Sequence, residues 1–105
     1  MEVEINESNY GDYAAKSDLL ILDFWATWCG PCRALSPVIA ELAKDYEGKA
    51  IVGKVNTDEN PDLCDKFGIR NIPTVLFLRK GELLDKNIGA TTKSVLAAKI
   101  DALLK

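Results

Sequence analysis

Apolar residues along the chain fall into short runs that predict strands alternating with helices. Residues 19–25 form a nearly continuous apolar run, which is typical of a central strand covered on both faces. Residues 31–46 instead repeat apolar side chains every three or four positions, as an amphipathic helix does. A further apolar run at residues 50–56 predicts another strand directly after this helix.

Turn residues and weaker patterns mark the remaining elements. Pro61 and Gly68 frame a short helix, because proline fits a helix start and glycine suits the position just past a helix end. Lys80-Gly81 separates two strand-like runs and predicts a hairpin. The remaining predictions are an edge strand at 3–6, a short helix at 8–16, a helix at 61–67, strands at 74–79 and 82–88, and an amphipathic helix at 92–104.

These elements follow one another in the order β-α-β-α-β-α-β-β-α, which predicts the α/β class. Strands separated by helices are expected to pair in parallel through right-handed crossovers, whereas the two hairpin strands must be antiparallel. We therefore expect a central mixed β-sheet with helices on both faces. The chain shows no repeat and no linker, so residues 1–105 are expected to form a single domain. A functional site is expected beyond the carboxyl ends of the strands.

Composition and charge exclude several classes of function. Lys and Arg number 13 against 16 Asp and Glu, and the two signs are interspersed, so nucleic-acid binding is disfavoured. Residues 1–10 are polar and acidic, and the longest uninterrupted apolar run is only residues 19–22, which predicts neither a signal peptide nor a membrane span. We expect a cytoplasmic monomer, whose three cysteines serve chemistry or metal binding rather than a disulfide framework.

The segment WCGPCR at residues 28–33 carries the strongest chemical signal. Cys29 should lie at the entry to the predicted helix and Cys32 in its first turn, with Gly30 easing the turn and Pro31 suiting the helix start. Free N–H groups and the helix dipole favour a thiolate at Cys29, which makes it the expected attacking sulfur. A bridge between two residues so close in sequence removes little unfolded-chain entropy, so it suits being made and broken.

Two further sequence features bear on this pair of cysteines. A zinc site is the structural alternative, but zinc needs four ligands, and the chain offers only Cys64 besides and no histidine. Asp23 interrupts the most apolar strand, where a buried carboxyl is costly unless it is paired or protonated. We interpret Asp23 as an acid-base group of raised pKa near Cys32. The alternative is that it lies in water at a frayed strand end.

Longer stretches of the sequence resemble the thioredoxin family over essentially the whole chain. The matching stretches are DFWATWCGPC with Pro37 in the following helix, KVNTDENP, IRNIPTVLFL, and the glycines Gly81 and Gly89. The resemblance implies the thioredoxin fold and a dithiol-disulfide oxidoreductase acting mainly as a reductant of disulfide-containing protein substrates. In it Cys29 attacks and Cys32 resolves, and a thioredoxin reductase reduces the resulting Cys29–Cys32 disulfide again. The family implies no bound cofactor.

The resemblance also implies roles for residues that the local sequence alone leaves ordinary. Lys54 would assist the proton transfer at Asp23. Ile72 and Pro73, joined by a cis peptide bond, would bind an extended substrate segment through backbone groups, although a trans proline at a strand start is the alternative. An apolar rim would surround Cys29, formed by Trp28, Gly89 and Ala90, whereas Trp25 is expected to support the core.

Three residues depart from the common family pattern. Asn71 stands where glycine is common, and Arg33 replaces the usual lysine. Cys64 is expected either as a small buried side chain or as an exposed regulatory thiol. Two other functions stay open at this point: a scaffold or folding-partner subunit that does not need the dithiol, and an oxidant or isomerase.

Overall fold

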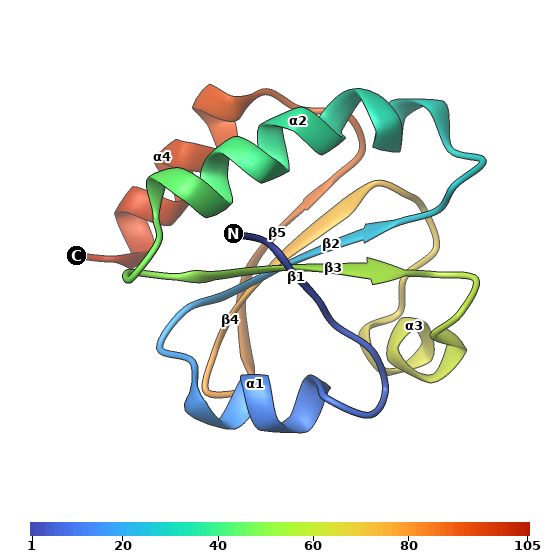
Figure 1. Cartoon of the computed structure of the whole chain (residues 1–105), viewed down its shortest axis with the longest axis horizontal. Coiled ribbons are helices and arrows are strands. Elements are labelled where there is room, and N and C mark those ends of the chain that lie inside the picture. The colour runs from blue at the N-terminus through green and yellow to red at the C-terminus, as the bar shows by residue number, and fades with distance from the viewer.

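The computed structural model describes residues 1–105 and contains nine elements in the predicted order (Figure 1). They are β1 (Val3–Glu4), α1 (Tyr10–Lys16), β2 (Leu20–Trp25), α2 (Gly30–Asp45), β3 (Ile51–Asn56), α3 (Pro61–Phe67), β4 (Thr74–Arg79), β5 (Glu82–Ile88) and α4 (Lys93–Leu103). The boundaries of α3, β4 and β5 match the prediction, and those of the other elements differ from it by at most two residues. None of the four helices is both long and apolar enough to cross a bilayer.

The five strands form one mixed sheet in the order β1-β3-β2-β4-β5. β1, β3 and β2 run parallel, as predicted, and β4 and β5 form the predicted antiparallel hairpin. The expectation that β4 would run parallel to its neighbour is wrong, because β4 pairs antiparallel with β2. Helix α3 has seven residues and spans about 10 Å, half the roughly 20 Å length of a six-residue strand. The chain re-enters the sheet at the end where β3 left it, because Thr74 pairs with Phe24 beside the Trp25–Asn56 pair.

Helices cover both faces of the sheet, as predicted, with α2 and α4 on one side and α1 and α3 on the other (Figure 1). The strand β2 contributes alternately to both cores. Ile21 packs among residues of α2 and α4, whereas Leu22 and Phe24 pack among residues of α1 and α3. Each of these fully buried side chains contributes about 2 kcal/mol of transfer free energy. The interior position of β2 explains its nearly continuous apolar run.

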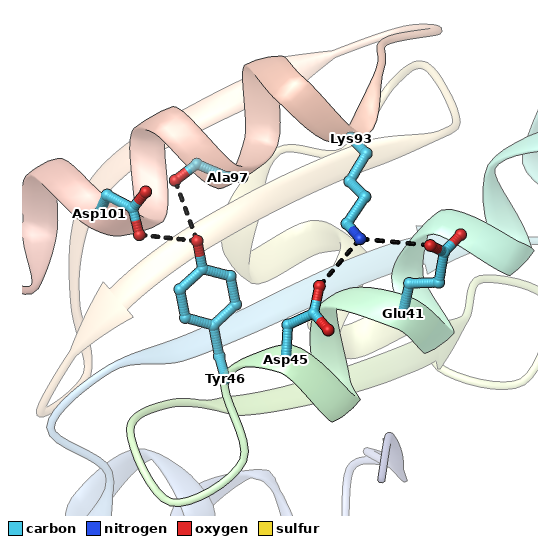
Figure 2. Close-up of polar contacts among 6 residues, drawn as sticks. All are labelled: Glu41, Asp45, Tyr46, Lys93, Ala97 and Asp101. Atoms are coloured by element: carbon cyan, nitrogen blue, oxygen red, sulfur yellow. Dashed lines mark hydrogen bonds and ion pairs between the residues drawn. The ribbon is translucent and has the colours of Figure 1, made fainter.

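Polar contacts join the C-terminal half of α2 to α4 (Figure 2). The Lys93 ammonium lies 3.2 Å from Glu41 Oε1 and 2.8 Å from Asp45 Oδ2. The Tyr46 hydroxyl donates to Asp101 Oδ1 at 2.7 Å. This hydrogen bond to a carboxylate, together with burial, raises the pKa of Tyr46 to about 12. The contacts hold the end of α2 that lies farther from the cysteines.

Candidate functional site

The two cysteines lie where the sequence predicts them, between the end of β2 and the start of α2. Cys29 is the N-cap of α2, with extended backbone angles, and its Sγ accepts a hydrogen bond from the Cys32 N–H at 3.2 Å. The two sulfurs are joined in a disulfide with Cα atoms 5.2 Å apart. Both residues are buried, so the disulfide lies in a small apolar cluster with Ala26.

The start of α2 favours negative charge on Cys29. Its first turn contains no acidic residue. Arg33 lies in this turn, and its guanidinium donates to the Thr27 carbonyl oxygen at 3.0 Å. Unpaired N–H groups and the dipole of a 16-residue helix stabilise a thiolate at this position after the disulfide is reduced. The geometry therefore suits Cys29 as the attacking sulfur.

A second segment approaches Cys29 from the start of β4. The Ile72–Pro73 peptide bond is cis, as the family resemblance implies, and the Ile72 carbonyl oxygen lies 3.9 Å from Cys29 Sγ. Gly89 N–H donates to the Pro73 carbonyl oxygen at 2.8 Å, which joins the end of β5 to this segment. Gly89 has a φ of 91°, a conformation that glycine adopts without a steric penalty. Ala90 follows it at the exposed surface.

Trp28 forms an exposed wall beside the cysteines. Its side chain is 67% exposed, and its Nε1–H donates to Asp58 Oδ2 at 3.0 Å. Trp28 and Ile72 also line a groove of about 170 Å³, which Thr57, Cys64, Ile69 and Arg70 complete. A large exposed aromatic side chain held in place by a hydrogen bond is a suitable contact for a partner protein.

Asp23 is the most perturbed carboxyl of the site. It is 1% exposed, and neither carboxyl oxygen has a hydrogen-bond partner. Burial raises the pKa of Asp23 to about 7, and the Lys54 ammonium opposes this rise. The alternative of a frayed, solvated strand end is wrong, because Asp23 is paired with β3 on one side and β4 on the other.

Lys54 lies beside Asp23 in the sheet register without forming an ion pair with it. Its Nζ donates to Ser36 Oγ at 3.1 Å and lies 4.7 Å from the centre of the Trp25 ring. Trp25 is half-buried and packs against the cysteine cluster, which fits the supporting role expected of it. The ammonium is thus held over an aromatic face close to the buried carboxyl.

Cys64 matches neither of the two environments expected for it. It is half-buried on α3, with its Sγ 3.9 Å from the Thr57 carbonyl oxygen. Burial, helped by nearby carboxylates, raises the pKa of this thiol, which lowers the thiolate fraction. No group of three or more His, Cys, Asp or Glu side chains is placed to hold a metal ion. The structure therefore offers zinc no ligand set.

Three residues near the site were not singled out by the sequence interpretation. Asp58 orients Trp28, Ser36 accepts from Lys54, and Glu2 has a buried carboxylate oxygen beside β3. The alternation of Glu2 and Glu4 with the apolar residues Val3 and Ile5 was a signal that the two glutamates share one face of this segment. Nothing in the local sequence distinguishes Asp58 or Ser36 from ordinary surface residues.

Comparisons with known proteins agree with this geometry. The family model described as Thioredoxin matches residues 2–102. The chain is 50% identical over 99 residues to a thioredoxin of Chlorobaculum thiosulfatiphilum, covering 93% of this chain and 92% of that one. It is 49% identical over 98 residues to a chloroplastic M-type thioredoxin of Pisum sativum, covering 92% and 57%. A mutant thioredoxin from Halobacterium salinarum NRC-1 superposes with a TM-score of 0.91 at 30% identity, covering 99% of this chain and 91% of that one.

Proposed function

Because the chain belongs to the thioredoxin family and is a thiol-disulfide oxidoreductase, we propose that it acts mainly as a reductant of disulfides in cytoplasmic proteins. One observation carries this proposal. The disulfide between Cys29 and Cys32 caps the start of α2, where the Cys32 N–H points at Cys29 Sγ. In the reduced protein the same N–H stabilises a Cys29 thiolate, which is the form that attacks disulfides.

The first step is an exchange between the Cys29 thiolate and a substrate disulfide. The thiolate attacks one substrate sulfur, a new bond forms between that sulfur and Cys29 Sγ, and the other substrate sulfur leaves as a thiolate. The substrate segment is held beside Ile72, whose carbonyl lies next to Cys29 Sγ. Backbone groups of residues 72 and 73 pair with the extended substrate chain. The apolar rim of Trp28, Gly89 and Ala90 contacts the side chains of the substrate segment.

The second step releases the reduced substrate. The Asp23 carboxylate takes the proton of the Cys32 thiol, and the resulting thiolate attacks Cys29 Sγ. The bond between Cys29 Sγ and the substrate breaks, and the Cys29–Cys32 disulfide forms. The substrate sulfur that was bound to Cys29 leaves as a thiolate. Two electrons have then passed from the protein dithiol to the substrate disulfide. Asp23 releases its proton to solvent, and the two leaving thiolates take up protons from solvent. Lys54 favours the ionised form of Asp23 during the proton transfer.

The proposal has consequences for partners and compartment. No cofactor takes part, because the dithiol itself supplies both electrons. An electron donor must reduce Cys29–Cys32 again, and we assign this role to a thioredoxin reductase. One chain contributes every group of the site, so a monomer suffices. The only disulfide is the one that exchanges, and Cys64 is a free thiol, which supports a reducing compartment such as the cytoplasm.

A redox titration tests the proposed direction of electron flow. The protein is equilibrated in graded thiol-disulfide buffers, its free thiols are alkylated, and each cysteine is measured by mass spectrometry. Cys29 and Cys32 should convert together at a potential more reducing than the cytosolic glutathione pool, with Cys64 unchanged. Conversion at a more oxidising potential would favour the oxidant or isomerase function instead.

Cysteine variants separate catalysis from a scaffold function. A Cys32→Ser protein should accumulate a mixed disulfide between Cys29 and a disulfide-bonded substrate protein, whereas Cys29→Ser should not react. Asp23→Asn should slow the second step and spare the first. If a protein with both cysteines replaced by serine keeps its cellular role, the scaffold function is correct and the dithiol is dispensable.

A further inference from the structure

A row of charged residues crosses the sheet beside the dithiol. Glu4 of β1 pairs in register with Lys54 of β3, which pairs in turn with Asp23 of β2. Residues in register on neighbouring strands share a face, and alternate residues of an extended segment share a face as well. Glu2, two residues before Glu4, therefore belongs to the same face as Asp23, the face covered by α2.

The side chains at this edge of the sheet line an open cavity of about 240 Å³. Its lining residues are Glu2, Val3, Glu4, Trp25 and Lys54. Within it, the Lys54 ammonium donates to Ser36 and lies over the Trp25 ring, and it forms no ion pair with a carboxylate. The cavity thus brings Glu2 to the residue that lies directly beside Asp23.

Glu2 and Asp23 hold all the buried side-chain polar atoms that lack a hydrogen-bond partner. These atoms are Oε2 of Glu2 and both carboxyl oxygens of Asp23. A buried carboxyl without a partner is costly in its ionised form, and a negative charge nearby adds to that cost. The Coulombic effect of Glu2 accordingly raises the pKa of Asp23, in the same direction as burial and against Lys54.

Glu4 lies in the same row but is exposed, and the elements packed against Asp23 present no other charged group to it. The buried residues of α2 are all apolar, including the disulfide-bonded Cys32. β4 places Val75 beside Asp23, and its only charged residue, Arg79, is exposed and bound to the Asp18 and Leu103 carbonyls. The buried residues of α4 are apolar. Lys54 and Glu2 are therefore the two opposing charges that act on the buried carboxyl.

We propose that Glu2 is a positioning residue of this site, which from the edge of the sheet holds the buried Asp23 carboxyl in its protonated form against the effect of Lys54. The consequence for catalysis rests on the proposed function, in which the ionised Asp23 accepts the proton of Cys32. The negative charge of Glu2 then raises the pH above which the second step of exchange is fast. Removing the charge of Glu2 should allow the second step to stay fast at lower pH.

Glu2→Gln and Glu4→Gln form a matched pair for testing this inference. Both variants remove one negative charge from residues that line the same cavity, and Glu4 is exposed. The Asp23 carboxyl carbon is followed by NMR in the oxidised protein across the neutral pH range. We expect its titration midpoint to move to lower pH in Glu2→Gln, to move less in Glu4→Gln, and to return toward the wild-type value in Glu2→Asp. An unchanged midpoint in Glu2→Gln, or equal movement in both glutamine variants, would overturn the proposal.

The rate of the second exchange step distinguishes this inference from the proposed function. The pH profile of release from a preformed Cys29 mixed disulfide should move to lower pH in Glu2→Gln by the same amount as the NMR midpoint. If the midpoint moves and the rate profile does not, Glu2 controls the protonation of Asp23 as proposed, and the role of Asp23 in exchange is wrong.

Discussion

Replacing Asp23 by asparagine tests the buried carboxyl through the pH dependence of stability. Asp23 has a pKa of about 7 in the folded protein against an ordinary value of 3.8, chiefly because burial disfavours its charged form. Between these values the unfolded chain binds fewer protons than the folded one, so the free energy of unfolding falls as pH rises. At about 1.4 kcal/mol per pKa unit, the ionisation of Asp23 removes about 4 kcal/mol of stability between about pH 4 and about pH 7.

Denaturant unfolding of the oxidised wild type and of Asp23→Asn measures this loss. Contributions from ionisable groups remote from Asp23 cancel in the difference between the two free energies of unfolding. The free energy of unfolding of the variant, relative to that of the wild type, should rise by about 1.4 kcal/mol per pH unit between about pH 4 and about pH 7. This difference should level off at higher pH. Glu59→Gln, at an exposed position, serves as the control and should not reproduce this pH-dependent gain.

A constant difference between Asp23→Asn and the wild type across this pH range would refute the reasoning. It would mean that the folded protein ionises Asp23 as readily as the unfolded chain does. The apolar strand would then provide no acid-base group near neutral pH, and the proposed proton transfer from Cys32 would need another acceptor.

Three other substitutions test contacts of the sheet and of α2. Lys54→Gln should raise the pKa of Asp23 further, because the ammonium lowers it, and an unchanged NMR midpoint would exclude this interaction. Tyr46→Phe loses the hydrogen bond to α4 and should lower the free energy of unfolding by about 1 kcal/mol, while ultraviolet titration of the wild type should show one tyrosine ionising near pH 12. Gly53→Ala would place a Cβ atom 2.4 Å from Ile5 Cγ1 and should lower the free energy of unfolding by about 1–3 kcal/mol; an unchanged Tm would show that β1 shifts freely.

The parts of the fold that the sequence predicts correctly are those with local signals. Pro61 and Gly68 frame α3 at the predicted residues, and Lys80-Gly81 forms the predicted hairpin with positive φ at both positions. The direction of β4 could not be read in the same way, because a helix between two strands normally indicates a parallel pair. It depends on how far the short α3 carries the chain along the sheet, which is a property of the assembled structure.

The residues of the candidate site also divide into those that a local sequence signal predicts and those that it does not. Cys29, Cys32 and Asp23 carry signals in their own surroundings, namely a helix start and a charge within an apolar strand. The cis bond before Pro73 has no such local signal and was expected only from the family resemblance. The contribution of Glu2 depends on the pairing of β1 with β3, fifty residues away in sequence, which local patterns do not specify.

The alternation of β2 between two cores makes this strand intolerant of any change in length. One residue inserted before Ile21 would turn the Asp23 carboxyl toward the core of α1 and α3 and would exchange Ile21 with Leu22 between the two faces. Folding and catalysis would fail together. The exposed turn at residues 47–49 carries no such constraint, so insertions that arise there can persist. Length can therefore vary in turns that pack against neither face of the sheet, but not in a strand that packs side chains into both cores.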